Sequence, residues 1–185
     1  QDRSAVEKFY NDAGISLELI PYVYSLPQLL AKNILRVLSE PALFDGAALE
    51  YTDPVTESAI RNAVAHFKPD CAWVEFTFLW PVVRLLNKLG VPSVMRSANN
   101  EAQQSIDEHG GNLFSHVLAI PKFRGEKIAA RESAVMLAIT PVEKDWYIQC
   151  GSKHVDVLPL RGLPKTLRTH QHSEKEKLDV VFLSS

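Results

Sequence analysis

The stretch "CAWVEFTFLWPVVRLLNKLGVPSVMR", residues 71–96, contains the pattern that decides the fold. Its first six residues are almost continuously apolar, which is typical of a central strand in a parallel sheet that is covered on both faces. A helix is indicated next, because Gly90 can close it in a left-handed conformation and four apolar residues fall at helical spacing: Val82, Leu85, Leu86 and Leu89. Residues 91–95 then form a second strand. We therefore predict a right-handed βαβ unit over residues 70–96.

The same alternation of helices and strands continues on both sides of this unit. In the helix predicted after Asp53, that residue is the N-cap and Pro54 the first helical position. Thr140 and Glu143 have capping-box spacing in a helix that Gly151 closes. Further helices are predicted up to Gly14, over 25–40 and over 114–134, the last as two pieces or with a kink at Pro121. Further strands are predicted over 15–23, 135–140, 154–160 and 178–185. This order predicts an α/β fold with an open, doubly wound parallel sheet.

Length and composition restrict the class of protein. The 185 residues suffice for one sizeable domain, or for one domain and a fragment of another. The net charge of -2 gives no electrostatic reason to expect nucleic acid, and no apolar run reaches the roughly 18 residues that span a bilayer. Cys71 and Cys150 match no metal-ligand spacing, so we interpret them as buried thiols of a reduced compartment.

The end of the chain changes character. Residues 164–177 are polar, charged and without periodicity, which predicts a linker between a first domain over 1–163 and a new strand over 178–185. The chain also opens inside a helix, without the strand that usually precedes a helix in this architecture. The pattern is therefore typical of a Rossmann-like domain that lacks its first strand, followed by the start of a truncated second domain.

Polar side chains follow three of the predicted strands at their carboxyl ends. In doubly wound sheets, ligands bind in the crevice beyond these ends. The candidate ligand-binding residues are Glu75 and Phe76 after the first strand, Arg96, Asn99 and Glu101 after the second, and Thr140 after the third. Since parallel strands end at the same edge of a sheet, we expect these residues to line one crevice.

A purely structural interpretation of these residues also exists. Ser97, Asn99 or Asn100 can cap the helix that follows, and Glu101 suits the positive end of that helix. Arg96 is less suited to a helix start, so it requires a partner, either an anionic ligand or one of the two carboxylates, Glu75 and Glu101. The sequence leaves these alternatives open.

Several chemistries have no motif in this sequence. It contains no G-x-G-x-x-G, no P-loop and no G-x-S-x-G elbow. No histidine has other metal ligands at useful spacing, so we predict no metal site, and no nucleophile can be assigned together with its base. Catalytic residues therefore stay unassigned.

Five segments in order resemble the N-terminal half of a glycosyltransferase of the family 4 type, which has the GT-B fold. They are "KPDCAWVEF" from 68, "LGVPSVMRSANNE" from 89, "ARESAVMLAITPVEKDWY" from 130, "HVDVLPLRGLP" from 154 and "LDVVFLSS" from 178. Arg96, Asn99 and Glu101 match the family pattern R-T-H-N-x-E, whereas Ala98 replaces its histidine. The sequence also lacks the family's paired glutamates at E-x(7)-E spacing, which belong to the C-terminal domain.

The resemblance implies an acceptor-binding domain that faces a C-terminal donor-binding domain of the same protein. The full enzyme would transfer a sugar, with retention, from a nucleotide-diphosphate sugar to a glycan or lipid-linked acceptor, whereas this domain binds no cofactor and is inactive alone. The resemblance also implies a cytoplasmic enzyme with peripheral contact to the inner face of the membrane. The sequence shows no strong basic amphipathic helix that would support such contact.

Two other classes of function remain open. A non-catalytic α/β module that binds a small molecule or a sugar would need no second domain. An interaction scaffold with a receiver-like sheet would need an acidic cluster at the strand ends, and Glu75 alone does not supply one.

Overall fold

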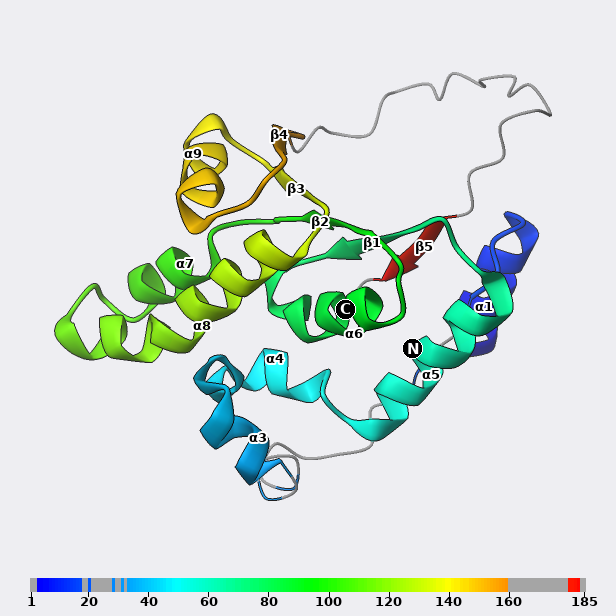
Figure 1. The fold of residues 1–185 in the computed structure, drawn as a ribbon, viewed down its shortest axis with the longest axis horizontal. Helices are drawn as coiled ribbons and strands as arrows, with labels where there is room; N and C mark the ends of the chain where they lie inside the picture. The colour runs from blue at the N-terminus through cyan, green and yellow to red at the C-terminus, as the bar shows by residue number, and fades with distance from the viewer. Residues whose placement is uncertain are drawn as a thin grey trace.

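The computed structural model describes residues 3–17, 20, 28, 31, 33–159 and 180–183. Helices and parallel strands alternate through most of this part of the chain (Figure 1). The elements before the sheet are α1 (Arg3–Asp12), α3 (Ile34–Ser39), the 3-10 helix η1 (Pro41–Phe44), α4 (Gly46–Glu50) and α5 (Pro54–Phe67). The sheet region contains β1 (Cys71–Glu75), η2 (Thr77–Leu79), α6 (Trp80–Lys88), β2 (Ser93–Arg96), α7 (Glu101–Glu108), α8 (Leu113–Glu132), β3 (Val135–Ala138), α9 (Pro141–Cys150), β4 (Val155–Val157) and β5 (Val180–Leu183).

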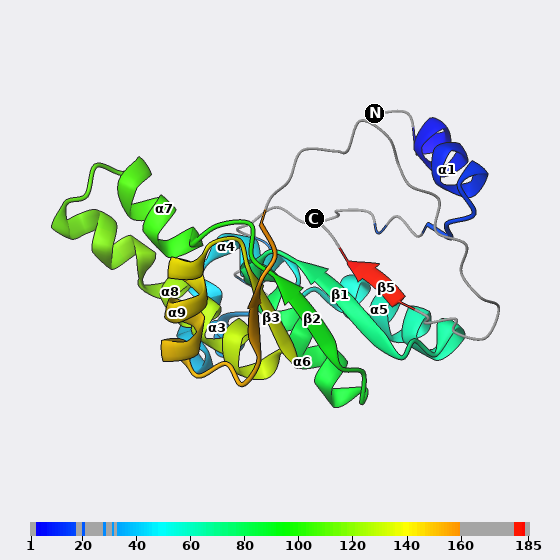
Figure 2. The ribbon, with the colours of Figure 1, turned by 90° about the horizontal axis from the view of Figure 1, so that it is seen from above.

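The described strands form one parallel sheet in the order β4-β3-β2-β1-β5. The predicted unit over 70–96 is confirmed, because β1 and β2 pair in parallel with α6 between them in the chain. Figure 2 shows the strands side by side, with α7 leaving the sheet from the end of β2. The predicted fold class is also confirmed: the protein is an α/β, Rossmann-like domain with a parallel sheet flanked by helices.

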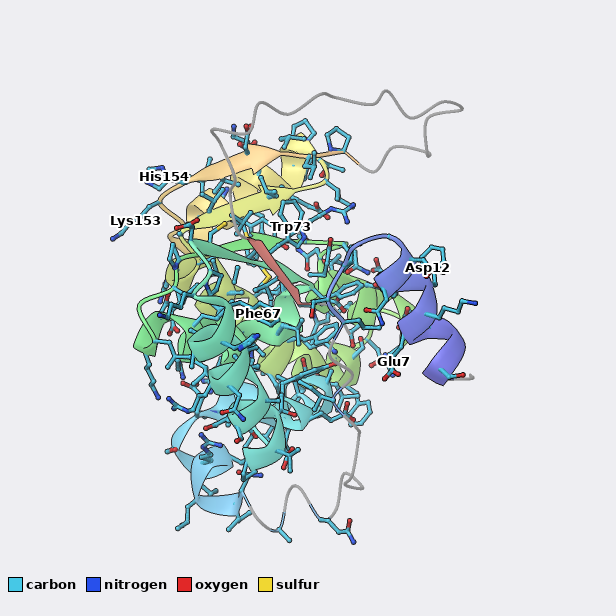
Figure 3. All side chains as sticks on the ribbon, turned by 90° about the vertical axis from the view of Figure 1, so that its right-hand side faces the viewer. Glu7, Asp12, Phe67, Trp73, Lys153 and His154 are labelled. Carbon is cyan, nitrogen blue, oxygen red and sulfur yellow. The ribbon has the colours of Figure 1, made fainter. Side chains whose placement is uncertain are left out.

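One hydrophobic core joins the sheet to its helices. From the strands it takes alternate residues, among them Val74, Met95 and Met136, and from α6 and α9 it takes Leu86 and Tyr147. Because side chains alternate across a strand, the neighbours of these residues point to the opposite face of the sheet. Figure 3 shows Trp73 on β1, beside β5 and near the end of α5 at Phe67. Packing in this core thus fixes where each strand ends and which way its last side chains point.

Local capping chemistry sets the ends of the helices, as predicted. The side chain of Asp53 accepts a hydrogen bond from the third amide of α5, and Thr140 does the same for α9. Gly90 and Gly151 adopt φ values of 77° and 98°, which residues with a Cβ rarely adopt. Glu143 completes a variant of the capping box, since its Oε2 accepts from the amide of Ile139 at 2.9 Å.

Three expectations differ from the structure. The alternative of two helical pieces around Pro121 is wrong, because Pro121 lies inside a single helix, α8, where packing at Ala119 and Ala129 outweighs the hydrogen bond that proline removes, whereas the alternative of a kink stays a prediction. The helix expected over 25–40 is interrupted by a turn at Asn33, and its other early residues are largely outside the described part. Of the strand expected over 15–23, only residues 15–17 and 20 are described, and they belong to no strand.

The last described strand, β5, pairs in parallel with β1, at Trp73 and Phe182 among other positions. An edge of β1 carries backbone groups that need partners, and an apolar strand supplies them. Residues 160–179 lie outside the described part, so the predicted linker and the domain boundaries stay predictions.

Candidate functional site at the strand ends

Glu75 and Arg96 form an ion pair at the carboxyl ends of the two central strands. They are register partners in β1 and β2, so their side chains leave the same face of the sheet, opposite Val74 and Met95. Nη1 of Arg96 lies 3.1 Å and 3.2 Å from the two carboxylate oxygens of Glu75. Glu75 is 8% exposed, so its charge is partly removed from water and the pair is held more tightly than a surface pair. The predicted partner of Arg96 is thus a carboxylate of this chain.

Trp73 fixes the position of the Glu75 carboxylate. It lies two residues before Glu75 on the same face of β1, and its indole Nε1–H donates a hydrogen bond to Oε1 of Glu75 at 2.9 Å. Backbone pairing continues beyond the strands, because the amide of Phe76 donates to the carbonyl of Arg96 at 2.9 Å. Arg96 Nε is enclosed and has no hydrogen-bond partner among the described residues. The ion pair engages Nη1 of the guanidinium group and leaves at least one of its donors, Nε, unused.

Ser97 connects the end of β2 to β3 and α9. Its amide donates to the carbonyl of Leu137 at 2.9 Å, and its Oγ donates to the carbonyl of Asn99 at 2.8 Å. The hydroxyl of Tyr147, buried in α9, donates to Ser97 Oγ at 2.8 Å. Burial, and then the charge of Glu126, raises the pKa of Tyr147 above its ordinary value. The phenol therefore stays neutral and keeps this donor role at physiological pH.

The turn after Ser97 leads directly into α7. Asn100 caps the helix, because its Oδ1 accepts from the amide of Gln103 at 2.9 Å. The side-chain amide of Asn99 donates to Gln104, while Asn99 Oδ1 is enclosed and has no partner within the described residues. Of the three capping alternatives in the sequence, the structure selects Asn100. Asn99 is consequently not used as a cap.

Glu126 of α8 holds the start of α7 from within the protein. It is 1% exposed, and its Oε1 accepts from the backbone amide of Glu101 at 2.7 Å. Burial raises the pKa of Glu126 to about 8, although hydrogen bonds from the amides of Glu101 and Ala102 oppose the shift. Glu126 is therefore mostly protonated near neutral pH. Its second oxygen has no hydrogen-bond partner among the described residues.

A narrow crevice lies between η2, α7 and α8. The empty space along it amounts to about 160 Å³, open solvent included, and it is too narrow to admit a water molecule. Lys122 pairs there with Asp45 at 3.2 Å, and the enclosed Thr77 Oγ1 has no partner within the described part of the chain. Burial is the main cause that raises the pKa of Glu101, which also lines this crevice. The crevice therefore combines carboxyl groups with a single paired cation among its described lining residues.

Aromatic rings lie at the turn that follows β1, next to the Glu75–Arg96 ion pair. Phe76 has a φ of 71°, which is unusual for a residue with a Cβ and typical of functional turns. Its ring stacks on Phe78 with centroids 5.3 Å apart, and Tyr51 lies 6.0 Å from Phe78. Both phenylalanine side chains are half-buried. An apolar ring surface beside fixed polar groups is typical of small-molecule sites.

The structure joins some of the predicted site residues and separates one. Glu75, Phe76 and Arg96 are linked directly, and Asn99 lies on the turn that follows. Glu101 faces the adjacent crevice. Thr140 is exposed and its hydroxyl caps α9, so its observed contact is structural. A ligand-binding role for these residues stays a prediction.

Four residues of this edge were not singled out by the sequence for these roles: Trp73, Ser97, Glu126 and Tyr147. A glutamate inside a helix is usually solvent-exposed, and nothing in the spacing names its partner. One signal was available for Glu126, because it shares a helix face with the small residues Gly125, Ala129 and Ala130. Small residues on one face indicate close packing, so a carboxyl among them is in a buried position.

A shallow depression at the other end of the sheet is a weaker candidate. It lies where β3 and β4 begin and is lined by Lys153 and His154, which Figure 3 places on the side away from α1. Ligands of parallel α/β sheets bind at the carboxyl ends, not at this end. Among the described residues no group of three His, Cys, Asp or Glu side chains is arranged to hold a metal ion.

Comparison with protein-family models, with curated proteins and with solved structures found no match. Within the described residues, no helix has the length and apolar character needed to cross a membrane.

Proposed function

We propose that this chain is the N-terminal, acceptor-binding half of a glycosyltransferase with the GT-B fold, of the family 4 type. The observation that supports the proposal best is the polar edge of the parallel sheet. There the Glu75–Arg96 pair and Asn99 lie at the carboxyl ends of β1 and β2, next to Phe76 and Phe78. The resemblance of the sequence to that family adds the order of the motifs around this edge.

The proposed chemistry is transfer of a sugar from a nucleotide-diphosphate donor to a hydroxyl group of the acceptor. In this account the domain contributes orientation, because a held acceptor turns a bimolecular step into an effectively unimolecular one. Asn99 and the Glu75–Arg96 pair orient the acceptor, and the aromatic pair supports its apolar side. The donor and its leaving diphosphate belong to a second domain, so this domain binds no cofactor and carries no complete reaction.

The proposed partners follow from the assignment of the acceptor to this domain and of the donor to a second domain. The acceptor is a glycan or a lipid-linked glycan, and the C-terminal domain of the same protein supplies the donor site. The proposed location is the cytoplasm, with peripheral contact to the inner face of the membrane where the acceptor is lipid-linked.

Two measurements test the proposal. The source DNA on both sides of the segment is read first, and we expect a second βα domain with E-x(7)-E after residue 185. The full-length gene product is then tested for release of nucleoside diphosphate from nucleotide sugars in the presence of a glycan extract. A gene that ends near residue 185 would contradict the enzyme proposal and would favour the non-catalytic sugar-binding module.

A further inference from the structure

The positive groups that the described residues bring to the strand-end edge already have partners in the chain, most of them carboxyl groups. We propose that this edge binds an uncharged, hydroxyl-bearing part of the ligand and excludes phosphate and carboxylate groups. The inference rests on the proposed function, because it names the acceptor chemistry of the same site. Three positive groups carry the argument: Arg96, the amides at the start of α7, and Lys122.

Arg96 is the natural anion receptor of this edge, and Glu75 occupies it. Guanidinium groups bind phosphate and carboxylate through paired donors. Here one of those donors already contacts both oxygens of Glu75, and Trp73 holds the same carboxylate from its other side. An incoming anion would have to displace Glu75 or lie beside its negative charge. Either choice weakens binding of an anionic group.

The start of α7 is occupied in the same way. The first amides of a helix attract anions, and several phosphate-binding folds use them. In this protein the amide of Glu101 donates to the buried Glu126, and the amide of Gln103 donates to Asn100. Glu101 itself stands in the first turn. The helix start is thus satisfied by groups of the chain and flanked by a further carboxyl.

Lys122 is the third positive group with a partner, because its Nζ lies 3.2 Å from Oδ1 of Asp45. Burial raises the pKa of Glu101, Lys122 opposes this shift, and the charge of Asp45 adds to it. Among the charges that act on Glu101, Lys122 has the largest effect, and Asp45 and Glu108 oppose it. A phosphate group at this position would have to compete with Asp45 for Lys122 and would lie beside the carboxyl group of Glu101.

The polar atoms without partners suit a neutral ligand. Among the described residues of this edge they include one acceptor, Asn99 Oδ1, one donor, Arg96 Nε, and the Thr77 hydroxyl. A hydroxyl group of a ligand both donates and accepts, so it satisfies either kind. These atoms are enclosed, and a ligand reaches them only when a neighbouring side chain moves. The stacked pair of Phe76 and Phe78 supplies an apolar surface beside them.

Titration with inorganic phosphate tests this inference. The indole N–H of Trp73 reports on Glu75, and its NMR signal is assigned by its loss in Trp73→Phe. Near neutral pH and at constant ionic strength, we expect no saturable shift in the wild type. Glu75→Gln releases Arg96 from its counter-charge, and we expect it to bind phosphate at least about tenfold more tightly than the wild type.

Two further variants keep the test decisive. Glu132→Gln removes a carboxylate from Arg84, which keeps Glu40, and serves as the matched control with no gain expected. Asp45→Asn releases Lys122 and should gain phosphate binding, measured by isothermal titration calorimetry alongside the wild type and the control, even if Glu75→Gln fails to fold. Saturable phosphate binding by the wild type would overturn the inference. It would also be overturned if neither Glu75→Gln nor Asp45→Asn bound phosphate more tightly than the control. The titration involves no sugar transfer, so its failure is separate from a failure of the transferase proposal.

Discussion

Replacing Glu126 by glutamine should remove a loss of stability that the wild type undergoes as pH rises. The pKa of Glu126 is near 8 in the folded protein, against about 4.5 for a glutamate in water. Between these values the folded state holds a proton that the unfolded chain has released, so the stability of the wild type falls as pH rises. The loss begins near the unfolded pKa and is complete above the folded one.

The expected size follows from the same two values. At 1.36 kcal/mol per pH unit, the wild type loses about 4 kcal/mol between about pH 5 and about pH 8 through this one group. Glu126→Gln does not titrate, and its amide oxygen can still accept from the amide of Glu101. The free energy of unfolding of the variant should therefore exceed that of the wild type by an amount that grows with pH.

Urea unfolding at a series of pH values measures this difference. The control is Glu108→Gln, since Glu108 is exposed at the end of α7 and its substitution should change stability by no more than about 0.5 kcal/mol at any pH. A difference between Glu126→Gln and the wild type that stays constant from pH 5 to pH 8, within about 0.5 kcal/mol, would refute the reasoning. It would mean that Glu126 is ionised in the folded protein or reaches water.

Three other substitutions test individual contacts of the domain, each by urea unfolding. Tyr147→Phe removes the buried donor to Ser97 and should cost about 1 kcal/mol, so an unchanged midpoint would contradict the hydrogen bond. Asp53→Ala removes the cap of α5 and should cost about 1 kcal/mol, while Asp53→Asn, which keeps a capping oxygen, should recover most of it. Gly125→Ala places a Cβ 2.9 Å from the buried ring of Trp80. We expect the free energy of unfolding to fall by about 1–3 kcal/mol, although alanine has the better helix propensity. Equal or higher stability of the variant would show that the ring can move.

The sequence predicted the parts of the fold that local chemistry determines. The apolar residues of β1 and the spacing in α6 indicated the βαβ unit, and Asp53, Thr140 and Gly151 marked helix ends that the structure confirms. These signals act within a few residues of chain, so they can be read without knowing the packing. Pro121 left two alternatives open for the opposite reason, since contacts with other elements decide that α8 is a single helix there.

The sequence predicted where the candidate site lies, but only some of the residues and contacts that form it. The carboxyl ends of parallel strands had to meet, and Arg96 had to find a partner, which proved to be Glu75. The contacts of Glu126 with α7 and of Tyr147 with Ser97 join residues 25 and 50 positions apart. No local pattern specifies such pairs, because they depend on how helices pack on the sheet.

The central claim is that the strand-end edge holds the acceptor of a glycosyltransferase. Release of nucleoside diphosphate by the full-length gene product tests it most directly, with wild type and Asn99→Ala compared over a range of acceptor concentrations. We predict acceptor-dependent release that falls at least about tenfold in kcat/KM for Asn99→Ala, while an Asn112→Ala control, which loses the cap of α8, stays close to wild type. No acceptor-dependent release by the wild type, or equal kcat/KM in the wild type and Asn99→Ala, would contradict it.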